Sequence, residues 1–236
     1  MPNSTPRSWH EKRTFYGKPG IVRSYETQRF GGASGQHVSQ RELGLVLALL
    51  PPGGPVLDLA CGTGRVSRAL RARGVQTVGL DVSLEMARTA HAASRAPTVL
   101  GDAFRLPFCD QAFAAVIALR LAFHYLELAP LVHEMTRVVR PGGVLIFDTC
   151  TYSPRALVPL RPGRWGGRVW AHPPATVRAI AGTLSLRVAH EHACFLGSPY
   201  LYRLAPLWLA RLAEAVEPRL PAGLLCRRYW QLLRTA

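Results

Sequence analysis

The sequence has little that would place it in a membrane or in an oxidising compartment. No apolar run reaches the ~18 consecutive residues that a bilayer-spanning helix needs, and the first twenty residues contain no signal-peptide stretch. The five cysteines stand singly, without a Cys-x-x-Cys spacing. That pattern argues against a disulfide framework and against a zinc site, so we expect reduced thiols, no metal and a cytoplasmic location.

Lysine and acidic residues are also scarce. The 29 basic residues include only two lysines, Lys12 and Lys18, and they face 14 acidic residues, for a formal net charge of +15. The imbalance is largest in residues 151–236, where 12 arginines stand against three glutamates. Such a region can contact nucleic acid, anionic lipid or an acidic substrate, or it can be a solvated basic face with no partner.

What the sequence does contain is a long alternation of helix and strand signals. Short apolar runs bounded by turn residues predict five strands, and periodic segments with capping residues predict helices between them. Parallel strands joined in this way form a doubly wound α/β sheet. The strands are expected at residues 55–59, 77–80, 98–100, 113–118 and 144–147, with helices at 42–50, 65–73, 83–93 and 128–138.

The first part of the chain has a different character. Residues 1–42 are polar, with scattered aromatics and a break at Gly31-Gly32. They predict a flexible arm followed by a short helical or looped cap. Residues 43–150 then form the core, and residues 151–236 complete the sheet and supply a second cover.

The pattern is less regular beyond the core. A final segment, 224–233, fits either a basic amphipathic helix, with Arg227 and Arg228 on one face, or a last strand, and periodicity alone does not decide between them. The other expected elements are a loop at 153–172, a helix at 175–184, a strand at 185–195 and a helix at 204–216.

A glycine turn and three aspartates carry the chemical signal. Residues 58–64 read DLACGTG between a strand and a helix, and such a turn lets the backbone approach a nucleotide-like ligand closely. Asp81 ends the next strand, where a carboxylate accepts hydrogen bonds from ribose hydroxyls. Asp102 follows the third strand. Buried carboxylates are costly without partners, so three of them at one sheet edge predict a ligand site there.

The motifs VLDLACGTG, VGLDVSLEMARTA, GDAFRLPFCDQAF and RVVRPGGVLIFD occur in this order. Together they resemble the motifs of class I S-adenosylmethionine-dependent methyltransferases, and in particular the ubiquinone/menaquinone-biosynthesis-type small-molecule enzymes. The resemblance covers about residues 43–150. It implies a doubly wound, mostly parallel, Rossmann-like sheet of seven strands, with an N-terminal cap and a helical C-terminal lid over the substrate. One position departs from the pattern, because Ala114 stands where the family usually has an acid.

The resemblance implies S-adenosyl-L-methionine as the cofactor. The glycine turn would hold its methionine end through backbone groups, and Asp58 would belong to the polar network of that turn. The turn residues concerned are Ala60, Cys61, Gly62 and Gly64.

Residues of the next two motifs are implied to hold the nucleoside. Asp81 would hold the ribose, and Val82 would pack on the adenine. Asp102 would accept a hydrogen bond from the adenine amino group, with Ala103 beside it.

The remaining candidates border the place where the methyl group moves. Leu119 and Arg120 would lie next to the sulfonium, and Tyr25 and Arg29 of the N-terminal cap are candidates to close over the cofactor. His124 is the best candidate for a general base, since its pKa range suits proton abstraction. A histidine that merely packs or caps the following helix explains the same position.

Other functions fit parts of the sequence. A nicotinamide-binding domain wants a third glycine where this chain has Ser67. A nucleic-acid methyltransferase fits the charge, but the fourth strand runs into Ala118-Leu119-Arg120-Leu121 and not into an Asn/Asp-Pro-Pro-aromatic motif. A cofactor-binding scaffold without turnover is the non-enzyme alternative. We expect a small, apolar or aromatic metabolite of the quinone, lipid or natural-product type as the methyl acceptor.

The C-terminal region holds aromatic side chains among its arginines. This combination favours either a lid that docks on the inner face of an anionic membrane or a surface that tracks a phosphate backbone. A helical cap with an arginine-rich surface and no partner is the third possibility. The residues concerned are Tyr200, Tyr202, Arg203, Trp208, Arg211, Arg227, Arg228, Tyr229 and Trp230.

Overall fold

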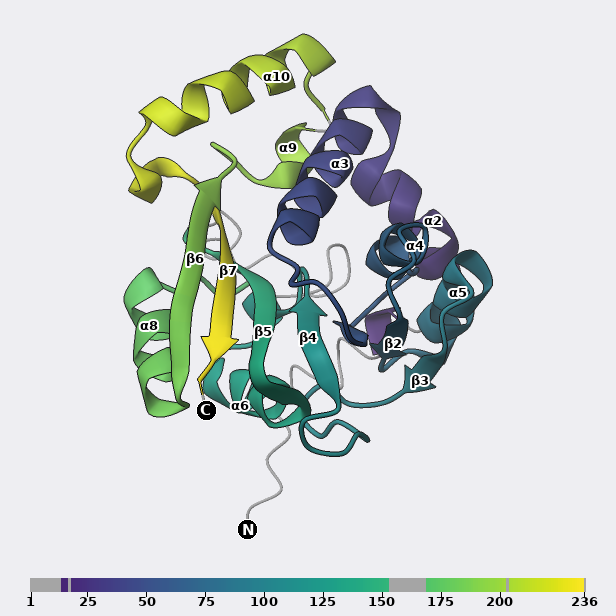
Figure 1. Cartoon of the computed structure of the whole chain (residues 1–236). Coiled ribbons are helices and arrows are strands. Elements are labelled where there is room, and N and C mark those ends of the chain that lie inside the picture. Colours follow the sequence, from purple (N-terminus) through teal and green to yellow (C-terminus); the bar gives the residue numbers. More distant parts are fainter. Residues whose placement is uncertain (1–13, 17, 153–168, 203, 236) are drawn as a thin grey trace.

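One mixed sheet of seven strands organises the molecule. The computed structural model describes residues 14–16, 18–152, 169–202 and 204–235. The strand order is β3-β2-β1-β4-β5-β7-β6, and only β7 runs against its neighbours. Figure 1 shows this sheet with β6 at one end and β3 at the other. The strands are β1 (Val56–Leu59), β2 (Thr77–Asp81), β3 (Thr98–Leu100), β4 (Phe113–Ala118), β5 (Val139–Cys150), β6 (Leu186–Cys194) and β7 (Arg227–Arg234).

The central strands β1 and β4 are covered on both faces. All residues of β1 and β4 are buried, which explains why they read as unbroken apolar runs in the sequence. The expected bounds of β3 and β4 are confirmed, whereas β5 is much longer than the expected 144–147. It begins at Val139, and its register against β4 shifts between Phe113 and Ala115, so Pro141-Gly142-Gly143 forms an irregularity within the strand.

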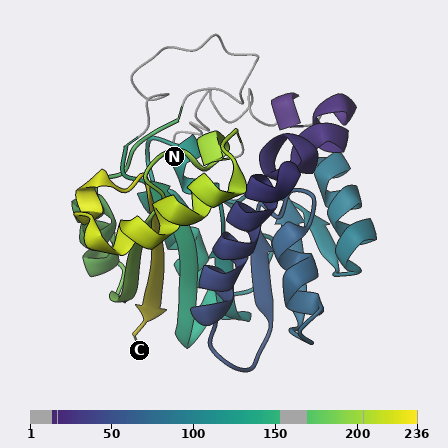
Figure 2. The same cartoon turned by 90° about the horizontal axis from the view of Figure 1, so that it is seen from above.

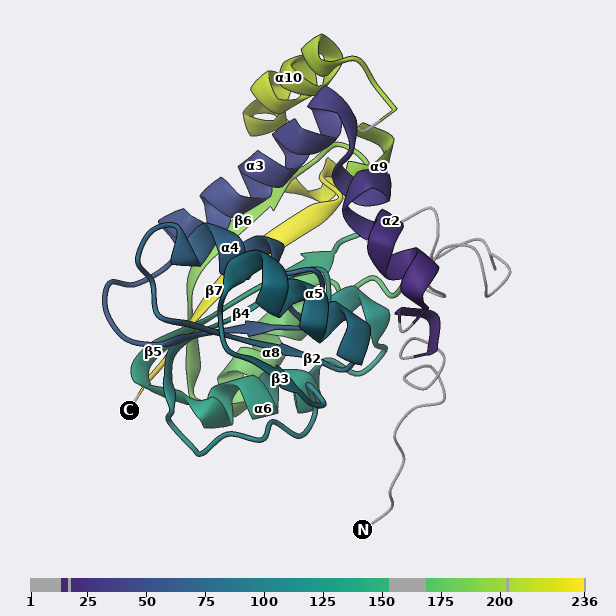
Figure 3. The same cartoon turned by 90° about the vertical axis from the view of Figure 1, so that its right-hand side faces the viewer.

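Helices cover both faces of the sheet, each over its own apolar core. On one face α6 (Ala129–Val138) and α8 (Pro174–Thr183) bury Leu131, Met135 and Val177. The opposite face is covered by α3 (Gly32–Ala48), α4 (Arg65–Arg71) and α10 (Leu207–Val216), with α5 (Leu84–Ser94) packed against α4. Figure 3 shows α3, α4 and α5 on one side of the sheet and α6 and α8 on the other. The expected doubly wound fold is confirmed.

The N-terminal cap is more helical than the sequence suggested. Two helices, α2 (Pro19–Phe30) and α3, replace the expected short cap, and the helix expected at 42–50 is only the end of α3. The break at Gly31-Gly32 is confirmed. The polar stretch before Glu42 gave little helical signal, but tertiary contacts hold it, since the Ser34 hydroxyl donates to the Ala205 carbonyl at 2.7 Å. The division expected at residue 42 therefore falls inside α3, and the arm at 1–13 lies outside the described residues.

The last element is a strand, so of the two alternatives for 224–233 the helix is wrong. As β7 it lies between β5 and β6, and Arg227 and Arg228 are buried, with 2% and 7% of their surface exposed. Tyr229 and Trp230 are buried as well. The basic aromatic stretch is therefore not one continuous surface, and Arg203 and most of the 153–172 segment lie outside the described residues.

Short helical segments complete the description. They are η1 (Ala122–His124), α9 (Pro199–Tyr202), η2 (Glu217–Arg219) and η3 (Ala222–Leu224). Within the residues that the structure describes, no helix combines the length and the apolarity that crossing a bilayer requires.

Candidate functional site

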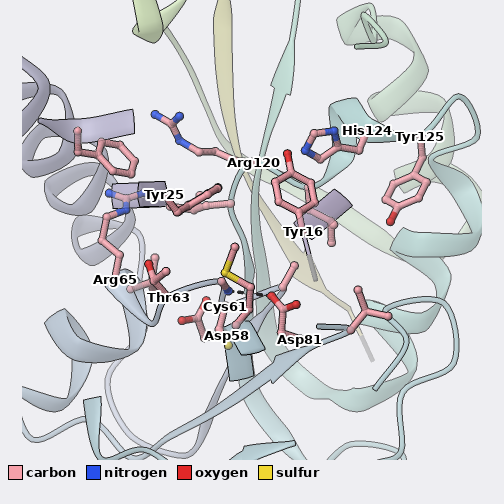
Figure 4. Close-up of a pocket in the computed structure, with 18 residues that line it drawn as sticks. Tyr16, Tyr25, Asp58, Cys61, Thr63, Arg65, Asp81, Arg120, His124 and Tyr125 are labelled. Carbon is pink, nitrogen blue, oxygen red and sulfur yellow. Dashed lines mark hydrogen bonds between the residues drawn. The ribbon is translucent and has the colours of Figure 1, made fainter. Parts of the chain in front are cut away.

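A pocket lies where β1, β2 and β4 end at their carboxyl edge, under residues of the N-terminal cap. It encloses about 930 Å³ of space, its open mouth included. Open α/β sheets bind ligands at this edge, where neighbouring strands lead to opposite faces. The lining residues are Tyr16, Tyr25, Phe30, Asp58, Ala60, Cys61, Gly62, Thr63, Arg65, Val66, Asp81, Val82, Met86, Leu119, Arg120, Leu121, His124 and Tyr125. Figure 4 shows Asp58 and Asp81 on one side of the pocket and Arg120 and His124 on the other.

The turn after β1 is built from left-handed residues. Ala60, Gly62 and Gly64 have φ values of 56°, 56° and 82°. A Cβ atom on Gly64 would lie 2.8 Å from the Cα of Ala90 in α5, so this glycine lets two helices approach closely. A Cβ on Gly62 would meet no atom of the chain within 4 Å, and Gly62 lines the pocket. The turn therefore leaves free space beside its own backbone, as a bound ligand requires.

Asp58 fastens this turn to the helix that follows it. One of its carboxylate oxygens accepts hydrogen bonds from the Ser67 backbone N–H at 2.9 Å and from the Ser67 hydroxyl at 2.6 Å. Burial raises the pKa of Asp58 to about 6, although both hydrogen bonds act in the opposite direction. Ser67 thus has a structural role where a nicotinamide-binding turn would have glycine.

Asp81 stands at the end of β2 with its carboxylate in the pocket wall. Its two oxygens accept from different backbone N–H groups, one from Gly62 and the other from Ser83, each at 2.9 Å. Burial raises the pKa of Asp81, which the hydrogen bonds partly offset. Because each oxygen has further lone pairs, this fixed carboxylate can also accept from a diol in the pocket.

The opposite end of the pocket contains a buried ion-pair network around Glu42 of α3. Glu42 is fully buried and accepts from Arg120 at 2.7 Å, from Arg65 at 3.0 Å and from the Tyr229 hydroxyl at 2.9 Å. Burial alone would raise the pKa of Glu42, but the charges of Arg120 and Arg65 outweigh it and lower the pKa to about 2. Both guanidinium groups also lie over the Phe30 ring, with centroid distances of 4.4 and 4.6 Å. The network ties α2, α3, α4 and β7 to the pocket.

The carboxylate of Asp148 extends this network into the sheet. Asp148 of β5 is fully buried and pairs with Arg227 of β7, and its other oxygen accepts from the Arg120 backbone N–H. Arg120 itself has a left-handed φ of 60°. The bend after β4 is therefore held from both its backbone and its side chain, which fixes the pocket wall at Leu119 and Arg120.

Aromatic side chains form the remaining wall. The His124 ring lies 5.9 Å from the Tyr16 ring and 4.6 Å from the Phe123 ring, and Tyr16 lies 6.1 Å from Tyr25. His124 belongs to the short helix η1 after β4 and reaches the pocket. Its packing between two rings agrees with a purely structural histidine, so its role as a base stays a prediction.

Four of the expected site residues do not line this pocket. Gly64 packs against α5, and Arg29 stacks on the Tyr25 ring at 5.2 Å. Asp102 accepts from the Phe104 backbone N–H at 2.9 Å, and Ala103 is buried in the core beside it. The other candidates, from Tyr25 to His124, converge as expected.

Several pocket residues were not expected from the sequence. Phe30 lines the pocket from the part of the chain where no motif stood out, Arg65 follows the glycine turn directly, and Glu42 lies behind the lining, where it pairs with Arg65 and Arg120. The only available signal was an acid in an otherwise apolar helix, at Glu42. The described residues after 125 do not contribute to the lining, so the C-terminal substrate lid stays a prediction.

The comparisons with known proteins agree with this geometry. Residues 57–147 match a family model described as a methyltransferase domain. The demethylmenaquinone methyltransferase of Mycolicibacterium paratuberculosis is 37% identical over 134 residues, which are 57% of each chain. The chain thus spans little more than half the length of the curated relatives that it matches.

Solved structures show the same fold over nearly the whole chain. Geranyl diphosphate C-methyltransferase from Streptomyces coelicolor, solved with S-adenosyl-L-homocysteine, aligns with a TM-score of 0.70 at 14% identity, covering 98% of this chain and 100% of that one. The [4+2]-cyclase SpnF aligns with a TM-score of 0.69 at 18% identity, covering 98% of each. Residues 57–147 therefore match the methyltransferase-domain family, and the seven-stranded sheet has the fold of these solved structures.

Proposed function

We propose that this protein transfers a methyl group from S-adenosyl-L-methionine to an oxygen, carbon or nitrogen atom of a small apolar or aromatic molecule. The observation that carries the proposal is one pocket with two unlike sides. One side has the open glycine turn and the fixed Asp81 carboxylate. The other has the aromatic rings of Tyr16, Tyr25 and His124. A polar nucleoside and an apolar acceptor need such a division.

The residues present fit the cofactor. Asp81 would accept from both ribose hydroxyls with the lone pairs that its backbone hydrogen bonds leave, and Gly62 leaves room for the methionine end. Val82 would pack on the adenine. Asp102, with Ala103, remains our candidate for the adenine amino group, although its carboxylate already accepts from Phe104.

Bound S-adenosyl-L-methionine would supply a methyl group already activated by a sulfonium, so the chain has mainly to align the acceptor and exclude water. Leu119 and the aromatic wall would do both. The guanidinium of Arg120 is directed to Glu42, which partly offsets its charge beside a sulfonium. If the acceptor atom must lose a proton, His124 is the nearest expected base.

The relatives support an acceptor that is apolar. One is named for demethylmenaquinone and a fold neighbour for geranyl diphosphate, and both names denote molecules with isoprenoid parts. We extend this chemistry to the present chain as a quinone, lipid or natural-product acceptor. We also propose a peripheral contact with a membrane, because such an acceptor partitions into lipid.

Calorimetry with S-adenosyl-L-methionine and S-adenosyl-L-homocysteine tests the cofactor half of the proposal. We expect binding to the parent protein and at least a tenfold loss in Asp81→Ala, since both carboxylate oxygens disappear. Glu85→Ala is the matched control, because Glu85 is an acid of α5 whose side chain is 42% exposed, only two residues beyond the helix cap Ser83. No heat with either ligand, from a folded protein, would contradict the proposal.

Metabolite profiling tests the acceptor half. Extracts of a host with and without the gene are compared for a species heavier by one methylene, which methyl transfer leaves on its product. The Asp81→Ala variant should abolish that species. Its persistence in the absence of the protein would show that another enzyme makes it.

A second candidate keeps the fold and the cofactor pocket without methyl transfer. The SpnF neighbour, with the same fold, is named as a [4+2]-cyclase, so the fold by itself does not specify the reaction. Cofactor binding by calorimetry without any methylated product would favour this alternative. The nucleic-acid alternative loses two of the arginines that suggested it, because Arg227 and Arg228 are buried in ion pairs.

A further inference from the structure

The helix α10 turns an apolar face outward. Ala210 is buried against the core, and the side of the helix away from it holds Trp208, Leu212 and Val216, which follow one another at the four-residue spacing of one helix face. Trp208 is 65% exposed and Leu212 is 52% exposed. We define the α10 apolar face as Leu204, Trp208, Leu209, Leu212 and Val216, all of them exposed.

This arrangement differs from that of an ordinary surface helix. A helix on a globular protein directs its apolar stripe to the core and polar residues to water. Here α10 has apolar residues on both sides, and its exposed side carries a tryptophan, two leucines and a valine. A cluster of this kind marks a surface that meets an apolar partner.

Ion pairs and a hydrogen bond fix α10 on the molecule, so its apolar face has a defined orientation. Glu217, just after α10, pairs with Arg41 of α3 and accepts from the Tyr202 hydroxyl at 2.9 Å. Glu214 pairs with Arg41 at 3.2 Å and with His37 at 2.7 Å. Figure 2 shows α10, in yellow-green, lying beside the dark blue α3. All of these contacts lie on the α3 side, which leaves the apolar face outward.

The charges around the face select the partner. Both acids of this region, Glu214 and Glu217, are engaged with α3. The exposed charges that remain among the described residues of this helix and of η2 are Arg211 and Arg219. A row of apolar residues with tryptophan, flanked by arginines and without free acids, matches the boundary of an anionic lipid bilayer.

We propose that the α10 apolar face docks this protein on an anionic membrane surface. Trp208 and Leu212 would enter the boundary between headgroups and acyl chains, with Arg211 and Arg219 at the phosphates. Of the basic aromatic stretch, Trp208 and Arg211 would make the membrane contact, and the buried Arg227 and Arg228 would not. It rests on the membrane contact proposed above and not on methyl transfer.

Co-sedimentation with large vesicles tests the inference. The probes are vesicles of phosphatidylcholine alone and of phosphatidylcholine with phosphatidylglycerol. We expect the parent protein to prefer the anionic vesicles. The variant Leu204→Gln/Trp208→Gln/Leu212→Gln should bind them at least tenfold more weakly, and Arg211→Gln/Arg219→Gln should lose the preference for anionic lipid.

The control replaces exposed leucines elsewhere, as Leu84→Gln/Leu100→Gln, at 46% and 50% exposure. It should bind as the parent does. Absence of parent binding, or equal binding by the α10 variant, would overturn the inference. So would a parent dimer that the α10 variant dissociates in the absence of lipid binding, because a second copy would then be the partner. Calorimetry with S-adenosyl-L-homocysteine on the same variants should give unchanged affinity, which separates this test from that of methyl transfer.

Discussion

Replacing Glu42 with glutamine tests the buried network that joins the cap to the sheet. Glutamine has nearly the same shape and keeps one acceptor oxygen, but it removes the carboxylate charge that Arg65 and Arg120 share. Both guanidinium groups stack on the Phe30 ring and would then be held close together with like charge. The variant therefore isolates the charge from the packing.

The size of the effect follows from the pKa of Glu42. Its fall from 4.5 to about 2 corresponds to about 3 kcal/mol in favour of the ionised form in the folded protein. Removal of one partner from a buried ion pair typically costs roughly 3–5 kcal/mol. We expect a loss of that size in the free energy of unfolding of Glu42→Gln, and a fall in Tm of roughly 10 °C.

Urea unfolding followed by circular dichroism measures this loss, and its pH dependence identifies the carboxylate. A carboxyl group whose pKa is lower in the folded state stabilises above its unfolded pKa and loses that contribution as pH falls. For Glu42 the loss runs from about pH 4.5 to about pH 2. The parent should lose about 3 kcal/mol more than Glu42→Gln across that interval.

The control is Glu85→Gln, which removes an exposed ion pair with Arg88 in α5. Exposed pairs of this kind contribute about 0.5 kcal/mol or less. A loss below about 1 kcal/mol in Glu42→Gln, or a pH dependence equal to that of the parent, would refute the reasoning.

Three further predictions concern the pocket. Gly64→Ala should lower the free energy of unfolding, since its Cβ would lie 2.8 Å from the Cα of Ala90, whereas Gly62→Ala should cost only about 1 kcal/mol of stability and weaken cofactor binding at least tenfold. Urea unfolding and calorimetry measure the two effects, and equal stability losses would contradict the packing role of Gly64 and the ligand-facing role of Gly62. In the parent, the raised pKa of Asp58 means that the free energy of unfolding falls as pH rises from about 3.8 to about 6. Asp58→Asn should remove up to about 3 kcal/mol of that decline, which unfolding at several pH values measures. His124→Gln should lower kcat at least tenfold and remove its pH dependence near neutrality if the residue is the base, whereas an unchanged pH profile identifies a packing residue.

The core could be predicted from the sequence because its signals are local. Buried parallel strands read as apolar runs, so the bounds of β3 and β4 follow from composition alone. The capping of α5 by Ser83 is also a local interaction, with the hydroxyl accepting from the Met86 N–H at 3.3 Å. Asp81 was identified for the same reason, since it ends an apolar run beside a glycine turn.

The parts that were missed depend on contacts between distant residues. The beginning of α3 has little apolar periodicity and is held by residues such as Ala205, 171 positions away. Arg227 was predicted to be a surface charge because no residue near it in the sequence indicates that it pairs with Asp148 in the core. The partners of Glu42 come from α4, from the turn after β4 and from β7, and no local sequence pattern contains that information.

The position of β7 also determines the order in which the sheet can be completed during synthesis. β6 pairs with β7 and with no other described strand, and β7 enters between β5 and β6. β7 follows the other six described strands in the sequence, so β6 lacks its partner strand in the sheet until residues 227–234 have been synthesised. Until then Asp148 lacks Arg227, and Glu42 lacks Tyr229. Before β7 is made, the nascent chain can form β1 to β5 and the glycine turn, but β5 is an open edge of the sheet. The addition of β7 then covers that edge and completes the buried ion-pair network in one late step.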